Sequence, residues 1–264
     1  MLVITDFHNP LVEPCLLTMG NFDGIHLGHQ SLLRYMQNLK GIKKDHKIVV
    51  ITFINHPLEV LHPTHAPRMI CCLEQKLLLL QEQGVDIVCL LEFTKELSEL
   101  PYDIFIRDLK SSCNFTDLIL GQGSSFGKDR QGIEENVKPL SEELGFACHY
   151  LPKYSQGDLT ISSGNIRKLI QRGELKEVAK LLGRPYSLFV TLELSDQHFV
   201  VAGEDLQHLE LPSPGTYNCK IIFSEKELPA IAYLEEDSRQ IRISCDLLPE
   251  GAHGSQCEIA FSDK

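Results

Sequence analysis

The chain has 264 residues, of which 43% are hydrophobic and 23% charged, as in an ordinary globular protein. This length suffices for one large domain or two modest ones, each with its own core. The formal charge of -11 at pH 7 argues against nucleic-acid binding, because that binding needs a basic surface to neutralise phosphates. A small anionic substrate would therefore need a local cluster of positive groups in an acidic protein.

The cysteines and the chain start indicate a cytoplasmic protein. Nine cysteines are scattered along the chain with no Cys-x-x-Cys, which fits reduced, mostly buried thiols. Residues 1–6 lack the basic start and long apolar core of a signal peptide. No run approaches the roughly 18 apolar residues that a membrane-spanning helix needs, so no membrane association is expected.

Alternating strands and helices in the first part of the chain predict an α/β domain with a parallel sheet covered on both faces. Residues 1–13 read as a lead-in with an edge strand. Ligands of such sheets bind beyond the carboxyl ends of the strands. The expected strands span residues 14–19, 47–53, 85–93, 117–121 and 146–151, and helices are expected over residues 73–83 and 102–110.

The turn after the first buried strand, residues 20–29 (GNFDGIHLGH), is the most informative stretch. A strand, a glycine-containing turn and a helix start direct free backbone N–H groups at a ligand, usually a phosphate. His26 and His29 are three apart, so on the first helical turn they share one face and can donate to one polyphosphate. The alternative is a packing junction with two ordinary histidines. The spacing is neither a P-loop nor the Gly-x-Gly-x-x-Gly fingerprint.

These ten residues resemble the His-x-Gly-His motif of the nucleotidyltransferase superfamily. They are particularly similar to the adenylyltransferase half of the bacterial FAD synthetase family (bifunctional riboflavin kinase/FMN adenylyltransferase). The resemblance implies a Rossmann-like domain that makes FAD and pyrophosphate from ATP and FMN with Mg²⁺, with catalytic roles for His26, His29 and Arg167. It places residues of the turn at ATP: Gly20, Phe22, Asp23, Gly24 and Gly28.

Two further patches follow expected strands. His56, in a Thr-Phe-x-x-His-Pro segment similar to the family's, either reaches the ligand crevice or is a loop histidine ordered by Pro57. Residues 120–132 form a glycine-rich basic loop that either closes over a nucleotide or is a solvated connection. The resemblance makes His56 and three residues of this loop the flavin and phosphate contacts: Phe126, Lys128 and Arg130. The family's aspartate in this loop is replaced by Gly123, which removes a carboxylate from the site.

A helix beginning near residue 162 offers a second phosphate site. Ser162 and Ser163 can cap it, and Arg167 in the first turn favours a functional explanation because a cation there opposes the helix dipole. The alternative is an ordinary capped helix with a surface arginine. The segment resembles the family's Ile-Ser-Ser-Thr/Ser-x-Ile-Arg, which implies that both serines bind ATP. Its third hydroxyl is replaced by Gly164.

The composition changes at about residue 186, where a short helix ends at Gly183 and Pro185 bars its continuation. We therefore place an adenylyltransferase domain at residues 1–186 and a degenerate kinase-like β-barrel at residues 187–264. Short strands separated by turns predict the barrel. Relative to the family, the barrel lacks the Gly-x-Pro-Thr-Ala-Asn segment, and Arg242 falls where the kinase has its catalytic glutamate. The expected strands span residues 188–194, 198–202, 216–223, 230–234, 240–245 and 257–261.

The sequence thus favours an FMN adenylyltransferase with ATP and FMN as substrates. Two alternatives remain open: a bifunctional enzyme that also phosphorylates riboflavin, and a non-catalytic flavin- or nucleotide-binding homologue. Metal ligands, flavin preference and oligomeric state are not determined by the sequence.

Overall fold

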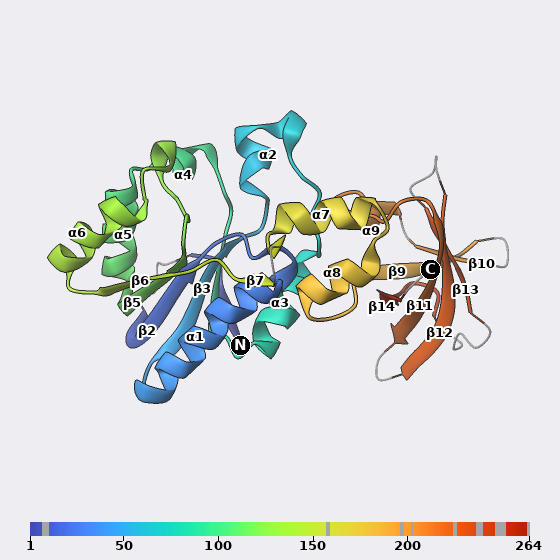
Figure 1. The fold of residues 1–264 in the computed structure, drawn as a ribbon, viewed down its shortest axis with the longest axis horizontal. Coiled ribbons are helices and arrows are strands. Elements are labelled where there is room, and N and C mark those ends of the chain that lie inside the picture. The colour runs from blue at the N-terminus through green and yellow to red at the C-terminus, as the bar shows by residue number, and fades with distance from the viewer. Residues whose placement is uncertain are drawn as a thin grey trace. The chain divides into compact units, whose positions relative to one another are not determined.

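The computed structural model describes residues 1–6, 11–156, 159–195, 198–201, 203–223, 226–235, 240–245 and 252–262. The chain forms two compact units (Figure 1). The first comprises Met1–Pro67 and Leu77–Thr160, and the second Arg68–Lys76 and Ile161–Lys264. The boundary expected at residue 186 lies inside the second unit and stays a prediction. No helix among the described residues is long and apolar enough to cross a bilayer.

The first unit is built on a six-stranded, entirely parallel sheet, which confirms the expected fold class. The strand order is β1-β4-β3-β2-β5-β6, so successive connections run outward from β2 in two directions. The crevice beyond the carboxyl ends of β2 and β5 is therefore the topological switch point, where ligands of such sheets bind. The strands are β1 (Leu2–Ile4), β2 (Leu11–Met19), β3 (Lys47–Phe53), β4 (Ile87–Leu91), β5 (Cys113–Gly121) and β6 (Ala147–Leu151).

Apolar, largely β-branched strands form the core of this unit because both faces of a parallel sheet are covered. Leu17, Val49 and Leu118 have no exposed surface. Helix α1 packs on β3 and β5, whereas α5 and α6 pack against each other and on β5 and β6 (Figure 1). The helices are α1 (Leu27–Ile42), α2 (Pro57–Leu61), α3 (Leu73–Glu82), α4 (Lys95–Glu99), α5 (Tyr102–Ser112) and α6 (Glu134–Leu144), with short 3-10 turns η1 (Asp23–Ile25), η2 (Pro63–His65) and η3 (Lys128–Arg130).

The second unit contains a closed antiparallel barrel, as expected from residues 187–264, together with short helices. Alternation along β11 buries Tyr217, Cys219 and Ile221 and leaves Asn218 and Lys220 exposed. The expected strand over 198–202 extends to residue 202, which lies outside the described residues. The elements of residues 161–264 are α7 (Ser163–Gln171), α8 (Leu175–Leu182), β9 (Ser187–Ser195), β10 (His198–Val201), α9 (Gly203–Leu206), β11 (Gly215–Phe223), β12 (Lys226–Leu234), β13 (Ile241–Ser244) and β14 (Ser255–Phe261). The hairpin of β7 (Ser155–Gln156) and β8 (Leu159–Thr160) comes before them in the chain and belongs to the first unit.

Candidate functional site

The turn after β2 holds the two histidines against each other. His26 is the N-cap of α1, one residue before the helix, and its Nδ1 accepts a hydrogen bond from the backbone N–H of His29 at 3.3 Å. The two rings are stacked, with centroids 3.7 Å apart and planes at 12°. Because Nδ1 of His26 is an acceptor, the neutral ring carries its proton on Nε2. The expected pairing of the histidines is present, although His26 caps the helix rather than belonging to its first turn.

The backbone of this turn adopts a sparsely populated conformation. Phe22 (φ 49°) and Ile25 (φ 38°) are in the left-handed region without being glycines, and Gly24 (φ 75°) lies between them. Such residues cost on the order of 1–3 kcal/mol each and cluster at ligand sites. Phe22, Asp23 and Gly24 are buried, so the turn is held by packing rather than by solvent-exposed contacts.

A cavity of about 680 Å³ opens at the carboxyl edge of the sheet. Its floor includes Met19 and Gly20 at the end of β2 and Leu120 near the end of β5, so it occupies the switch point. Of the residues expected at the site, four line it: Gly20, Phe126, Lys128 and Arg130. His26, His29 and His56 belong to the same unit and do not line this cavity.

Four phenylalanine rings give the cavity two aromatic walls. Phe53 and Phe93 meet edge to face, with centroids 5.3 Å apart. The rings of Phe105 and Phe126 are tilted at 58° to each other with centroids 6.0 Å apart. An apolar pocket of this size with charged groups at its rim suits a flat aromatic ligand that carries an anionic tail. Sequence reasoning missed three of these rings, although Phe53 and Phe93 stand at or just beyond the ends of neighbouring parallel strands.

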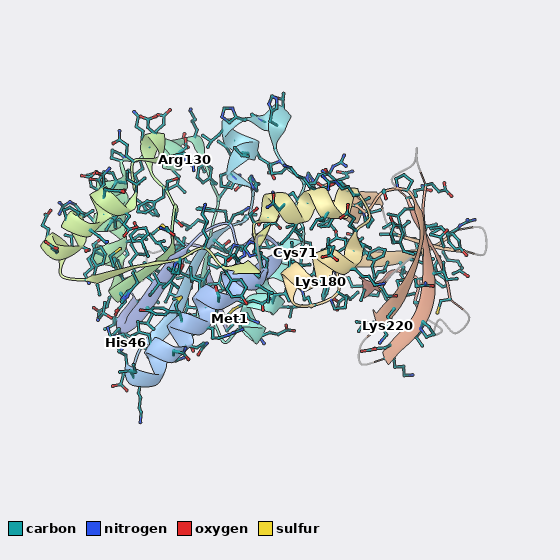
Figure 2. The ribbon with its side chains drawn as sticks, in the orientation of Figure 1. Met1, His46, Cys71, Arg130, Lys180 and Lys220 are labelled. Atoms are coloured by element: carbon teal, nitrogen blue, oxygen red, sulfur yellow. The ribbon has the colours of Figure 1, made fainter. Side chains whose placement is uncertain are left out.

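The loop after β5 supplies the charged side of the cavity. Lys128 and Arg130 are exposed, and Nε of Arg130 donates to Oγ of Ser125 at 2.8 Å. Figure 2 labels Arg130 beside α4, which contacts η3. Gly127 has φ 71°, and a Cβ there would lie 2.7 Å from Cα of Tyr102, so the loop path requires glycine.

Gly123, where the resembling family has an aspartate, lies beside a lysine. A Cβ at this position would be 3.6 Å from Cε and 3.7 Å from Nζ of Lys153. These are ordinary contact distances, so a carboxylate at residue 123 would be within reach of an ammonium group.

His56 has a local structural function. Its Nδ1 accepts the backbone N–H of Leu58 at 3.1 Å, which makes His56 the N-cap of α2. Pro57, the next residue, lines the cavity. The role of His56 at a ligand stays a prediction.

The second candidate phosphate site lies in the second unit. Ser162 caps α7 by accepting the backbone N–H of Asn165 at 3.3 Å, as expected. Because the helix begins at Ser163, Arg167 is in its second turn, so the placement in the first turn is wrong. Nε of Arg167 donates to the backbone oxygen of Arg68 at 2.6 Å. A Cβ on Gly164 would approach Ser162 Oγ only to 4.0 Å, so this helix start has room for a side chain.

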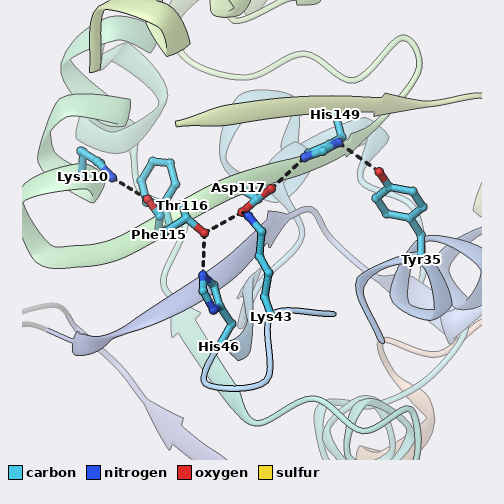
Figure 3. A network of polar contacts seen from close by, with 8 residues as sticks. All are labelled: Tyr35, Lys43, His46, Lys110, Phe115, Thr116, Asp117 and His149. Carbon is cyan, nitrogen blue, oxygen red and sulfur yellow. Dashed lines mark hydrogen bonds and ion pairs between the residues drawn. The ribbon is translucent and has the colours of Figure 1, made fainter. Parts of the chain in front are cut away.

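A buried carboxylate network joins side chains from α1, the loop after it, β5 and β6 (Figure 3). The carboxylate of Asp117, 2% exposed, accepts hydrogen bonds from Lys43, from Thr116 at 2.6 Å and from Nε2 of His149 at 2.9 Å. Nδ1 of His149 lies 3.0 Å from the Tyr35 hydroxyl. Burial alone raises the pKa of Asp117, but the Lys43, Thr116 and His149 hydrogen bonds outweigh it and hold the pKa below its usual range. Sequence reasoning missed this cluster.

That network does not belong to the cavity. Lys43 and His46 lie between α1 and β3, which places the network at the amino end of β3. Nε2 of His46 is 2.9 Å from Thr116 Oγ1, and Figure 2 labels His46 far from Arg130. The cluster therefore fastens α1 and its following loop to β5 and β6 rather than facing the ligand edge.

In the barrel, Arg242 lies on β13 with its guanidinium carbon 4.9 Å from the centroid of Tyr233. The guanidinium group of Arg242 thus makes a cation–π contact with the Tyr233 ring. An arginine cannot accept a proton from a hydroxyl, so this strand does not present a general base at residue 242.

Comparison with known proteins identifies the family. The FAD synthetase family model matches residues 8–165. The chain is 31% identical to the bifunctional riboflavin kinase/FMN adenylyltransferase of Escherichia coli K12 over 242 aligned residues. This alignment covers 88% of this chain and 77% of the relative. The chain is also 29% identical to the FAD synthetase of Listeria monocytogenes over 208 aligned residues. That alignment covers 76% of this chain and 79% of the relative.

A solved structure shares the whole fold. The crystal structure titled macrolide-efflux protein from Streptococcus pneumoniae superposes on this chain with a TM-score of 0.87 at 22% sequence identity. The superposition covers 100% of this chain and 89% of the chain in that crystal structure. This likeness concerns the fold alone, whereas the family model and the sequence relatives identify the lineage. The chain belongs to the FAD synthetase family.

Proposed function

We propose that this chain is an FMN adenylyltransferase that makes FAD and pyrophosphate from ATP and FMN. The observation that supports this most directly is the aromatic cavity at the switch point, directly beside the histidine turn of a chain of the FAD synthetase family. The isoalloxazine ring would enter this cavity and pack against its phenylalanine rings. Its phosphate would point toward the rim, where Lys128 and Arg130 lie.

In the proposed reaction, a phosphate oxygen of FMN attacks the α-phosphorus of ATP. The new O–P bond forms as the bond from the α-phosphorus to the pyrophosphate oxygen breaks, and pyrophosphate leaves with that electron pair. No covalent enzyme intermediate is needed, so the protein contributes position and charge stabilisation.

The histidine turn would act on the departing phosphates. With Nδ1 of His26 committed to the His29 backbone, Nε2 is the nitrogen that donates to a ligand. His29 would donate alongside it as negative charge moves onto pyrophosphate. The turn residues Gly20, Phe22, Asp23, Gly24 and Gly28 would bring backbone groups close to ATP.

Ser162, Ser163 and Arg167 would bind the β- and γ-phosphates at the start of α7. The N-terminus of a capped helix presents backbone N–H groups to an anion, and both serines stand there. Arg167 lies in the second turn of α7, and the hydrogen bond from its Nε to the backbone oxygen of Arg68 orients its guanidinium group. His56, whose neighbour Pro57 lines the cavity, would contact the flavin or its phosphate together with Phe126, Lys128 and Arg130.

Mg²⁺ is part of the proposal as the ion that accompanies the phosphates of ATP and neutralises their charge. The described residues contain no cluster of three side chains able to hold a metal. Mg²⁺ keeps several waters and is bound chiefly through substrate phosphates, so it would enter the site with ATP. Asp129, a carboxylate on the cavity wall, is the residue here that would hold one of its waters.

The proposal also places the protein in the cytoplasm. All nine cysteines are free thiols, and burial raises the pKa of Cys15 and Cys257 to about 12. Neutral, buried thiols suit a reducing compartment, which is also where ATP and FMN are available.

The test is incubation of the purified chain with ATP, Mg²⁺ and FMN, with riboflavin in a parallel tube, followed by chromatography of the flavins. We expect FAD from FMN and unchanged riboflavin. FMN formed from riboflavin would instead support a bifunctional enzyme. No product in either tube, with FMN still bound in a titration, would support a non-catalytic binding protein and refute the proposal.

A further inference from the structure

One wall of the aromatic cavity is fixed by a side chain that does not line it. Asn55 follows the end of β3, and its side-chain amide meets the backbone of Phe93 twice. Nδ2 of Asn55 donates to the Phe93 carbonyl at 3.0 Å, and Oδ1 accepts the Phe93 N–H at 2.8 Å. Both backbone polar groups of Phe93 are thereby satisfied by one planar amide.

This pair of bonds continues the sheet beyond its strands. β3 and β4 end in register at Phe53 and Leu91, and the backbone N–H of Ile54 donates to Leu91 at 2.9 Å. Asn55 then substitutes for the next strand residue by offering a donor and an acceptor to Phe93. The two loops leaving β3 and β4 therefore remain attached to each other at the ligand edge.

The consequence is a defined aromatic surface. Phe53 and Phe93 both line the cavity, and their rings are perpendicular at 89° with centroids 5.3 Å apart. Edge-to-face contact is a favoured arrangement of two aromatic rings, and the Asn55 bonds fix the backbone from which the Phe93 ring projects. Asn55 is half-buried and absent from the cavity lining.

The second pair of rings, Phe105 and Phe126, is attached differently. Phe126 belongs to the loop after β5, in which Asp129 (φ 53°) and Arg130 (φ 58°) adopt the left-handed conformation. Phe105 comes from α5. Only the Phe53 and Phe93 wall carries a reciprocal side-chain-to-backbone pair of the kind that Asn55 makes, among the described cavity residues.

We propose that Asn55 is a positioning residue that pre-forms the Phe53–Phe93 wall for the flavin ring and so sets flavin affinity without contacting the flavin. The identity of the ligand rests on the proposed function. A pre-formed surface binds more tightly because the ligand does not have to order it. Asn55 thus acts on flavin binding and not on the phosphates of ATP.

Asn55→Ala tests this, with Asn114→Ala as the matched control. Asn114 also joins two strand ends by donating from Nδ2 to a backbone oxygen, that of Val12, at 3.0 Å, but it does so at the amino end of the sheet. The dissociation constant of FMN is measured by flavin fluorescence without ATP, and that of ATP by calorimetry with Mg²⁺. Circular dichroism establishes that both variants are folded.

We expect Asn55→Ala to weaken FMN binding about tenfold, from two lost hydrogen bonds, with ATP affinity within about twofold of wild type. Asn114→Ala should leave both affinities unchanged. Unchanged FMN binding in Asn55→Ala, or an equal loss for FMN and ATP, would overturn the proposal.

A second variant addresses the path through Phe93. Phe93→Ala removes the ring and leaves the backbone that Asn55 binds, so it should weaken FMN binding by itself. If Asn55 acts by placing that ring, adding Asn55→Ala to Phe93→Ala will weaken binding by less than about twofold more. Additive losses would refute the mechanism. Wild-type protein that binds FMN but forms no FAD would refute the enzymatic function and leave this inference testable.

Discussion

The buried carboxylate of Asp117 makes a quantitative prediction about stability. Asp117→Asn keeps the shape of the side chain but removes the charge that faces Lys43 and His149 (Figure 3). The side-chain nitrogen of the new asparagine is itself a hydrogen-bond donor. It would face another donor, because Lys43, Thr116 and His149 all donate to the carboxylate of Asp117. The variant therefore lowers the free energy of unfolding in two ways.

The magnitude follows from burial and from the partners. A hydrogen bond to a charged group contributes about 1.5–3 kcal/mol, and removing one partner of a fully buried pair costs about 3–5 kcal/mol. Here Asp117 is 2% exposed but Lys43 is 33% and His149 26% exposed, so both partner side chains regain water when the charge of Asp117 is removed. We therefore expect a loss of about 2–3 kcal/mol, equivalent to a fall of roughly 4–12 °C in Tm.

The direction of the pKa shift determines how the stabilising effect of Asp117 changes with pH. The pKa of Asp117 is lowered in the folded state, so its contribution is present above the unfolded carboxyl pKa, about 3.9, and is lost as pH falls through the folded value. Thermal unfolding of both proteins should show a constant difference from pH 5 to 8 that narrows below about pH 4.

A surface pair provides the control for that measurement. Glu143 lies 2.7 Å from Arg107, with both side chains well exposed, so Glu143→Gln should change Tm by about 2 °C or less. An Asp117→Asn variant as stable as Glu143→Gln at pH 7, or a difference that persists undiminished at pH 3, would refute the reasoning.

The remaining predictions concern the candidate site. His29→Ala should lower FAD formation at least about tenfold with the circular dichroism spectrum unchanged, and near wild-type rates would contradict the proposed role. Gly127→Ala should destabilise the first unit by about 2 kcal/mol or more, because its Cβ would meet Tyr102 Cα at 2.7 Å at a φ of 71°; an unchanged Tm would contradict this. Gly164→Ser has room beside Ser162 and should lower KM for ATP by up to about tenfold, and an unchanged KM would exclude a phosphate contact there.

The sheet could be predicted because its strands are continuous apolar runs. Residues 47–53 match β3 at both ends, since the strand is a continuous run of buried, largely apolar residues that follows the polar residues Asp45 and His46. Helix α6 was not assigned, because Pro139 inside it and few apolar residues obscure the period. Tertiary packing of Val137 and Leu140 supports that helix, and such packing is not visible in a local window.

The site was only partly predictable, for a different reason. The histidine turn is contiguous, so its residues could be found together in the sequence. The cavity wall assembles Phe53, Phe93 and Phe105 from elements up to about 50 residues apart, and each alone resembles a core residue. Asn55 gave no signal at all, because its function depends on the register of β3 against β4, which places it opposite Phe93.

Two of the departures from the family pattern replace a polar side chain by glycine: Gly123 in the loop after β5, and Gly164 at the start of α7. At Gly164 an added side chain meets nothing closer than 4.0 Å, and at Gly123 it meets the flexible end of Lys153 at ordinary contact distance. Gly123 has φ 81°, a conformation that aspartate tolerates better than most residues. Neither position has been filled by a rearranged neighbour, in contrast to Gly127, where backbone leaves no room for a Cβ. The proposed enzyme has therefore lost individual polar contacts while keeping the scaffold that would position them, so its activity should respond to restoring single side chains.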